Sequence, residues 1–511
     1  MTDEKNSAKI ESFLALIIED DIKIGKKHHL AIALMHIFVF YLFVLNLITS
    51  SEQMYQVPKD YYFYIAVIIF MLFLLFARKE KIAIVPTLVT ITTGGVIMTG
   101  LFVAKKIGPQ YYGPLYFQVI LFSWIIFILF VILLVNSINS TIRNKQKFNH
   151  KEAFIFVATF AIPIVFNSRY LLPVIMPILA FMLSDFSKKT LHNLLPKLAI
   201  GYYLAFLHMM AKSFIKNSDR FEVGRFLGAF GQIESAGMFC AGAIVCVLFF
   251  FIRFRWQGEK SKLLYFMLVL FFVPPVYSTM IISSRSTFLA LFFMIVMCFV
   301  FLCGKGNRKA TILRGAFGLG IIVTSVLLML MISSFWNKKA SMGELDHPNY
   351  VQAHVMVLTN PGYRKGYFGE DSFLNILDRA SSDRMKIWAE SLGQISWNGH
   401  PYEGMYVSNG NEADDYIFTP HNFPILWLIN YGLIGGLFVI VWYFRILIKL
   451  LFYCIHRDET FIFSTIWVFY SVGIFMFSCV NWTYPVGFML LVLQGIISIS
   501  DRWKGNECYE A

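Results

Sequence analysis

Two residues that could act on a substrate lie in one polar stretch of the chain, between residues 381 and 435. Arg384 belongs to the segment SSDRMKIWAE, and His421 belongs to TPHNFPILWLINYGLIGG, where a long apolar run begins. The planar guanidinium group of an arginine can hold a phosphate or a carboxylate through two hydrogen bonds. A neutral imidazole near pH 7 can accept a proton from an attacking hydroxyl group. The helices that carry the two residues must position them for such chemistry.

The segment from Ser382 to Ser396 is predicted to form one amphipathic helix. An apolar stripe at spacings of three and four comprises Met385, Trp388, Leu392 and Ile395. The Asn398-Gly399 pair ends the helix. Arg384 then lies in the first turn, on the same face as the aromatic anchor Trp388. At this position Arg384 could contact a substrate phosphate or carboxylate. It could equally form a salt bridge to a nearby acidic residue of the loop.

The next helix is predicted to begin just before His421. Thr419 can cap it and Pro420 fits its first turn. His421 and Asn422 would then lie in the first turn, where backbone N–H groups are unpaired and the helix dipole disfavours a positive charge. The imidazole should therefore stay neutral, as a general base requires. The alternative is a histidine that only marks the membrane interface.

The composition excludes a soluble globular protein. The chain has 57% hydrophobic and only 15% charged residues, whereas soluble domains carry about 25% charged residues. Continuous apolar runs of about 20 residues predict an all-α polytopic membrane protein with about 12–14 transmembrane helices. The candidate spans lie near 30–50, 60–76, 82–103, 115–136, 153–167, 170–184, 197–214, 231–252, 263–282, 286–303, 312–334, 423–444, 460–480 and 484–499.

Lysine and arginine are concentrated in alternate loops between these spans, which predicts that those loops and both termini are cytoplasmic. This topology accounts for most of the net charge of +13 without a nucleic-acid partner. No cysteine lies in the large outer loop, and none has metal-ligand spacing with histidine, so neither a disulfide framework nor a metal is indicated. The chain then divides into a cytoplasmic tail (1–29), N-terminal transmembrane helices (30–214), helices with basic outer turns (215–335), a large outer loop between the eleventh and twelfth spans (336–420), C-terminal transmembrane helices (421–499) and a cytoplasmic tail (500–511).

Two outer turns break the charge rule. The first, KSFIKNSDRFEVGRFLGAFGQIESAG, is rich in glycine and carries four cations: Lys212, Lys216, Arg220 and Arg225. A basic, glycine-rich turn that leads into a helix suits an anion, although a polar loop that contacts lipid headgroups would look similar. The second turn, SSRST, carries Arg285 at the outer end of two spans. Arg285 could line a polar substrate site or extend its side chain to the membrane interface.

The order of these motifs resembles the O-antigen ligase domain. The pattern S-x-R-x-x-x-W around Arg384 and Trp388 precedes His421 and Asn422, and the following apolar run ends in YGLIGG. SSRSTFLALF and RFLGAFGQIESAG resemble the serine-arginine and glycine-rich turns of the same domain. The resemblance covers about 220 to 440, and it depends on the order of short motifs within a many-span chain with one large outer loop. O-antigen ligases, many O-antigen and capsule polymerases and some protein O-oligosaccharyltransferases share this domain.

The resemblance implies an inverting, metal-independent glycosyltransferase that needs no cofactor and works on the periplasmic face of the bacterial inner (cytoplasmic) membrane. The donor would be a glycan on undecaprenyl diphosphate. The acceptor would be a sugar hydroxyl on lipid A core, for a ligase. Outer arginines would hold the donor diphosphate and a loop histidine would be the catalytic base. These residues are Arg220, Arg225, Arg285, Arg384 and His421, with Trp388 and Asn422 in support.

Two alternatives remain open. An O-antigen or capsule polymerase would join two lipid-linked repeat units, and it is favoured by the high span count and by the R-x10-G spacing of Arg220 and Gly231. A multispan flippase or transporter would explain the many spans, but few ionisable groups line them. His208, within the seventh span, could belong to a proton path or could simply bond a neighbouring helix.

Overall fold

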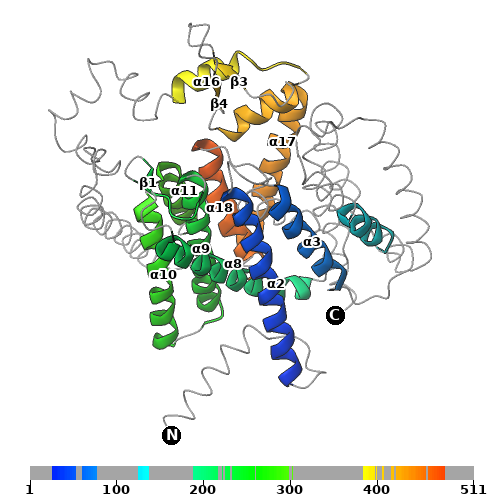
Figure 1. Ribbon diagram of the computed structural model, residues 1–511, viewed down its shortest axis with the longest axis vertical. Coiled ribbons are helices and arrows are strands. Elements are labelled where there is room, and N and C mark those ends of the chain that lie inside the picture. The colour runs from blue at the N-terminus through cyan, green and yellow to red at the C-terminus, as the bar shows by residue number, and fades with distance from the viewer. Residues whose placement is uncertain are drawn as a thin grey trace, which may run out of the picture.

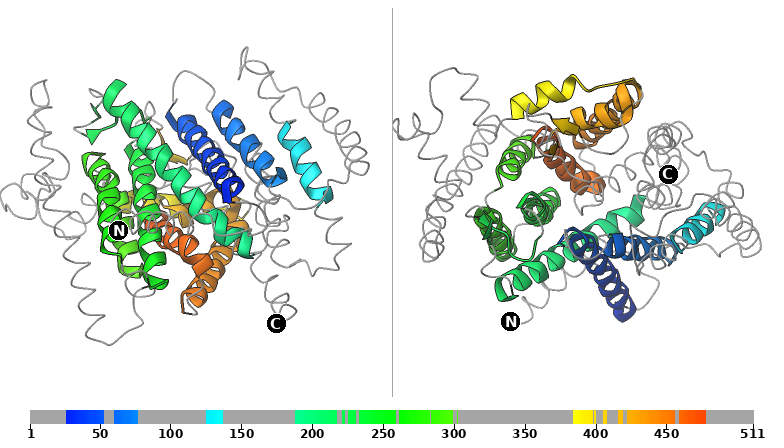
Figure 2. Two further views of the ribbon diagram at one scale, coloured as in Figure 1. Left: turned by 90° about the horizontal axis from the view of Figure 1, so that it is seen from below. Right: turned by 45° about the horizontal axis from the view of Figure 1, so that its top comes forward.

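The computed structural model describes sixteen stretches of the chain (Figures 1 and 2): residues 26–52, 60–76, 125–136, 188–216, 221–222, 225–230, 233–258, 261–282, 284–298, 302, 384–397, 399, 405–407, 416–418, 422–455 and 459–477. Nearly all of these residues are helical. The helices are α2 (Lys26–Glu52), α3 (Asp60–Phe76), a helix over Ile125–Asn136, α8 (Lys188–Lys216), α9 (Ile233–Trp256), α10 (Lys262–Ile282), α11 (Arg285–Met297), α16 (Arg384–Leu392), α17 (Phe423–Ile455), the 3-10 helix η4 (Glu459–Phe461) and α18 (Ile462–Phe477).

Two short antiparallel hairpins are the other regular elements in these stretches. Strand β1 (Phe221–Glu222) pairs with β2 (Arg225–Phe226), and β3 (Met405–Val407) pairs with β4 (Tyr416–Phe418). The second hairpin falls within the predicted outer loop, for which no strands were predicted. These hairpins are too small to change the predicted all-α class.

Within the described stretches, five helical segments are long and apolar enough to cross a membrane, as the composition predicts. They are Leu30–Ile48, Leu191–Ile215, Ile233–Trp256, Lys262–Ile282 and Gly432–Phe452. Shorter apolar helices include Ile65–Leu75, Ile125–Asn136, Ser286–Met297 and Glu459–Ile474. The spans predicted at 82–103, 153–167, 170–184, 312–334 and 484–499 lie outside the described residues, so the total number of spans stays a prediction.

Contacts between the helices establish their directions. Arg253 near the end of α9 donates a hydrogen bond from Nη2 to Nε2 of His192 near the start of α8 (3.0 Å), so these helices are antiparallel. Trp256 at the end of α9 donates to the carbonyl oxygen of Leu302 beyond α11 (3.1 Å), so α9 and α11 run the same way. The ends of α8 and α10 therefore lie beside the starts of α9 and α11. We call this the hairpin end of the bundle, because β1–β2 lies there.

α17 and α18 follow the same alternation. Gln257 after α9 donates to Glu459 of η4 (3.1 Å), which places the start of α18 at the opposite end of the bundle. α17 finishes at Ile455, only four residues earlier, so the apolar span that ends it, Gly432–Phe452, begins at the hairpin end. Basic residues at the opposite end include Lys188 and Lys262. The alternation is the one that the predicted topology requires, while the face of the membrane that each end meets stays a prediction.

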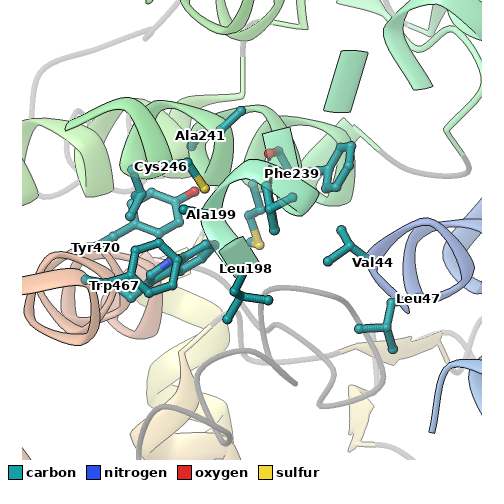
Figure 3. Packing of buried hydrophobic residues seen from close by; sticks show 14 of the residues in the cluster. Val44, Leu47, Leu198, Ala199, Phe239, Ala241, Cys246, Trp467 and Tyr470 are labelled. Atoms are coloured by element: carbon teal, nitrogen blue, oxygen red, sulfur yellow. Dashed lines mark hydrogen bonds between the residues drawn. The ribbon is translucent and has the colours of Figure 1, made fainter. Parts of the chain in front are cut away.

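The core lies where α8, α9 and α18 meet. Trp467 and Tyr470 of α18 lie beside Cys246 of α9, and all three are buried (Figure 3). α18 also packs closely on α11 through Gly473, where an added Cβ would lie 2.5 Å from the Cα of Ala290. Lipid tails are as apolar as these side chains, so it is their close packing, and not their removal from water, that stabilises the bundle. α18 is therefore the helix that joins α11 on one side to α17 on the other.

α17 consists of two helices joined at Gly432. Gly432 has φ 71° and ψ 175°, a conformation that residues with side chains rarely adopt. The first segment folds back on the second, so that Leu428 packs against Gly436 with its Cα 2.7 Å from where a Cβ would stand. The membrane span begins only at Gly432 and reaches Phe452. The span predicted at 423–444 shifts accordingly, because hydropathy does not register a break inside an apolar run.

α16 is shorter than the predicted helix 382–396, since it covers nine residues and ends at Leu392. Its predicted apolar stripe is wrong at Leu392, which is 52% exposed. The side chains that pack on the first segment of α17 are Ile387, Trp388 and Ile395, which contact Ile425 and Ile429. The Leu433 N–H also donates to the carbonyl oxygen of Ser396 (2.9 Å). α16 and the first segment of α17 therefore form one packed unit.

His208 bonds a neighbouring helix, which was one of its two predicted roles. Its Nδ1 is hydrogen-bonded to the hydroxyl group of Tyr41 on α2 (2.8 Å). A tyrosine hydroxyl that bonds an imidazole across two helices stabilises their contact by about 0.5–2 kcal/mol in a membrane. The bond gives His208 a structural role.

The Gly432 break can be tested with a matched glycine. Gly432→Ala and Gly258→Ala both place a side chain at positive φ (71° and 75°), and the backbone conformation of Gly432, with ψ 175°, is one that essentially only glycine adopts. Only at Gly432 would the new Cβ also overlap other atoms, in Trp397 and Gly399, whereas nothing lies within 4 Å at Gly258. Gly432→Ala should therefore lower the thermal unfolding midpoint in detergent clearly more than Gly258→Ala. Equal shifts of the two midpoints would contradict the packing at Gly432.

Candidate functional site

The two basic turns of the sequence meet at the hairpin end. Gly237, in the first turns of α9, lies directly against the start of α11: a Cβ there would lie 2.6 Å from Oγ1 of Thr287 and 2.7 Å from Cβ of Ser284. Any larger residue would separate the two helices. The glycine-rich segment and the SSRST turn, about 50 residues apart in sequence, are thus one packed structure.

α11 begins with an arginine and without a side-chain cap. Arg285 is its first residue, and no acidic residue lies in its first turn. Ser284 has the extended backbone of a cap (φ −79°, ψ 116°), but in the described residues its side chain does not cap the helix. Its Oγ instead lies 3.2 Å from Oγ of Ser286, and both serines are buried. Among the described residues, the Ser284 side chain therefore does not satisfy the first N–H groups of α11.

The β1–β2 hairpin is anchored on the end of α8. Gly228 takes a positive φ of 58° and packs on Ser213, whose hydroxyl accepts a hydrogen bond from the Ala229 N–H (3.0 Å). Phe226 stacks on Phe214 with ring centroids 5.1 Å apart. This anchoring fixes the backbone of β2, which begins with Arg225. The backbones of Arg225 and Arg285 therefore both lie at the hairpin end.

The start of α17 differs from the prediction. Asn422 is the cap, because its Oδ1 accepts a hydrogen bond from the Ile425 N–H (3.1 Å) and its carbonyl oxygen accepts one from Leu426 (3.0 Å). α17 begins at Phe423, so the predicted cap at Thr419 is wrong. His421 precedes the cap and is not in the first turn. The argument that the first turn keeps its imidazole neutral therefore no longer holds in that form.

The sequence did contain the signal for this start. Asn422 is followed at two residues by Pro424, which lies in the first turn of α17, and this pair fits a helix start as well as Thr419 and Pro420 do. Asn422 is only 5% exposed and Phe423 is fully buried. The cap therefore holds the start of α17 against the bundle.

α16 carries Arg384 as its first residue. Trp388, one turn later, lies in the contact with Ile425 and Ile429 of α17. Trp388 thus joins the helix of Arg384 to the helix that follows His421. Contacts continue from α17 to α18 and from α18 to α11, so a continuous set of packed helices links the starts of α16, α17 and α11.

Several predicted site atoms lie outside the described residues. These are all atoms of Arg220 and His421 and the side chains of Arg225, Arg285 and Arg384. The convergence of these groups on one substrate stays a prediction. Within the described stretches, no group of three or more His, Cys, Asp or Glu side chains could hold a metal ion.

Comparison with known proteins adds no further assignment. The chain matches no protein-family profile, no curated protein and no solved structure.

The Asn422 cap yields a stability prediction. Asn422→Ala removes the side-chain acceptor of the Ile425 N–H in a buried position, and loss of such a cap costs about 1–2 kcal/mol. Asn422→Ser keeps an acceptor oxygen and should recover much of that loss. Thermal unfolding in detergent should rank the midpoints wild type, then Ser, then Ala. A serine variant as unstable as the alanine variant would show that capping is not the reason for the asparagine.

Proposed function

We propose that this protein is a membrane glycosyltransferase of the O-antigen ligase type. It moves a glycan from undecaprenyl diphosphate to an acceptor sugar hydroxyl on the outer face of the bacterial cytoplasmic membrane. The observation that carries the proposal is the start of α11, where Arg285 stands on an uncapped helix start at the end of the bundle that the topology predicts to be outside. An arginine at a helix start is unfavourable unless an anion lies beside it.

The charge pattern at the other end of the bundle does not explain this arginine. α2, α8 and α10 also begin with lysine and have no acidic residue in the first turn that the structure describes. Those starts lie at the end predicted to be cytoplasmic, where positive charge is favoured. At the hairpin end the topology works against a cation. A bound diphosphate would offset both costs at Arg285.

The packing of the helices supports a site shared by the two halves of the chain. Gly237 brings the glycine-rich segment against the start of α11, and Asn422 holds the start of α17 against the bundle. α16 packs on that same segment of α17 with Arg384 at its start. All of these helix starts belong to one end of the helix bundle or to the unit that caps it (Figure 1).

The chemistry follows from the two substrates. The leaving group is a diphosphate whose developing negative charge fixed guanidinium groups can stabilise without a metal ion. The proposed groups are Arg220, Arg225, Arg285 and Arg384. The acceptor hydroxyl has a high pKa, so a base such as His421 assists attack by taking its proton as the glycosidic bond forms. The bond between the anomeric carbon and the diphosphate oxygen breaks in the same step, with inversion.

The acceptor distinguishes the two forms of the proposal. A ligase transfers the glycan to lipid A core, whereas a polymerase transfers it to a second lipid-linked repeat unit. A flippase would instead need a polar path through the spans. His208, an ionisable residue within a described span, is hydrogen-bonded to Tyr41, which does not favour such a path.

The base assignment is tested with two outer histidines. His421→Ala should abolish glycan transfer by the protein reconstituted with a lipid-linked donor and each acceptor in turn. His400→Ala, in the same loop, should keep most of the activity. General bases contribute about 10²–10⁴-fold, so a loss of less than tenfold in His421→Ala would remove the assignment. Transfer to lipid A core alone or to a lipid-linked repeat alone would identify ligase or polymerase.

The phosphate contact of Arg384 is tested by Arg384→Lys. A lysine keeps the charge but cannot form two parallel hydrogen bonds, and one charge-assisted bond contributes about 1.5–3 kcal/mol. Affinity for the lipid-linked donor should fall by about tenfold or more, while Lys386→Ala in the same helix should bind as the wild type does. Unchanged donor affinity in Arg384→Lys would show that its guanidinium group does not hold the diphosphate.

A further inference from the structure

The turn after α16 exposes two large apolar side chains. Trp397 is 69% exposed and Leu392 is 52% exposed, although both belong to the unit that packs on α17. The indole ring of a tryptophan has an apolar body and one N–H group. Such a side chain is favoured where one end meets an apolar medium and the other meets water.

The backbone around Trp397 lies at the level where a membrane span begins. Its carbonyl group contacts Gly432, and the neighbouring carbonyl group of Ser396 accepts a hydrogen bond from the Leu433 N–H (2.9 Å). Gly432 is the first residue of the apolar span that reaches Phe452. Trp397 therefore lies level with the first residues of a helix that crosses the membrane.

The exposed surface of that span is apolar. After Gly432, α17 exposes apolar side chains at spacings of three and four: Ile434, Leu437, Phe438 and Val441. In a membrane-spanning helix this stripe faces lipid. α16 itself lies across the direction of α2 and α10 rather than along it, above the hairpin end (Figure 1). An orientation across the bundle suits a helix at the surface of a bilayer.

We infer that Trp397 and Leu392 insert into the interfacial layer of the bilayer and dock α16 on the membrane surface. Tryptophan is enriched at this depth, where its ring sits at the level of the headgroups. The turn is held by its close contact with Gly432 and by the hydrogen bond from the Leu433 N–H to the Ser396 carbonyl oxygen. The lipid surface would thus fix the height of the α16–α17 unit. This docking does not depend on glycan transfer, and its test measures depth rather than activity.

The depth of the indole can be measured in the full-length protein. The protein is labelled with a fluorinated tryptophan and reconstituted in nanodiscs of phosphatidylcholine and phosphatidylglycerol. Fluorine NMR then assigns Trp397 as the signal that disappears in Trp397→Phe, and Trp388→Phe assigns the matched control. A phosphatidylcholine that carries a nitroxide near its headgroup should remove the Trp397 signal. The Trp388 signal should be affected less, since that ring packs against Ile425 and Ile429.

A water-soluble gadolinium chelate supplies the opposite probe. Strong broadening of the Trp397 signal by gadolinium without loss in the nitroxide lipid would overturn the proposal, and it would indicate a water-facing surface such as a glycan platform. Insensitivity to both agents would also overturn it, because another part of the chain or a second copy would then cover the ring. Loss in the nitroxide lipid, for Trp397 more than for Trp388, is the result that supports docking.

Discussion

The arrangement of α16 and α17 at the hairpin end depends on one backbone contact, between Gly432 and the turn that contains Trp397 and Gly399. A positive φ at Gly432 reverses α17, and the absence of a side chain lets the carbonyl group of Trp397 approach the break. The first segment of α17 is thereby placed between the bundle on one side and α16 on the other. Without this break, α17 would run straight into the membrane, and α16 would lose the surface formed by Ile425 and Ile429. Arg384 begins α16 and Asn422 caps α17, and these are the two helix starts that this contact positions.

Hydropathy and charge predicted the class of the protein and several spans well. α3 begins and ends at the predicted residues 60 and 76, and α10 differs from its predicted start by one residue. Such boundaries can be predicted because the length of a membrane span is set by the bilayer. The break in α17 was not predicted, although NYGLIGG is less apolar than the residues around it and contains Asn430 and three glycines. A glycine inside an apolar run is also tolerated in a continuous helix, so the backbone conformation of Gly432 is what identifies the turn.

The candidate site, too, was predicted only in part from the sequence. The sequence identified the basic turns and the helix start near His421, because charge on the wrong side of a membrane is visible in the residue order. It did not identify the cap, since Thr419 with Pro420 and Asn422 with Pro424 are equally good starts. Choice between them depends on burial of Phe423 in the bundle, which is a tertiary contact. The contact of Gly237 with Ser284 could not be predicted from the sequence either. A small residue in a helix indicates that another helix packs closely there, but it does not identify which one.

A donor that keeps its polyprenyl tail in the membrane limits where its diphosphate can react. The diphosphate stays at headgroup depth, so the groups that hold it must lie at that depth, while the acceptor hydroxyl arrives from outside. The start of α11 satisfies the first condition, since Arg285 begins an apolar helix at the hairpin end. α16 would satisfy it only if something holds Arg384 at the same height, because α16 is not itself a membrane span. The contact of the Trp397 turn with Gly432 would fix the height of Arg384 through the protein itself. Docking of Trp397 and Leu392 would fix the same height through the lipid. The depth of the α16–α17 unit relative to the bilayer would therefore matter to the proposed site as much as its charged residues do.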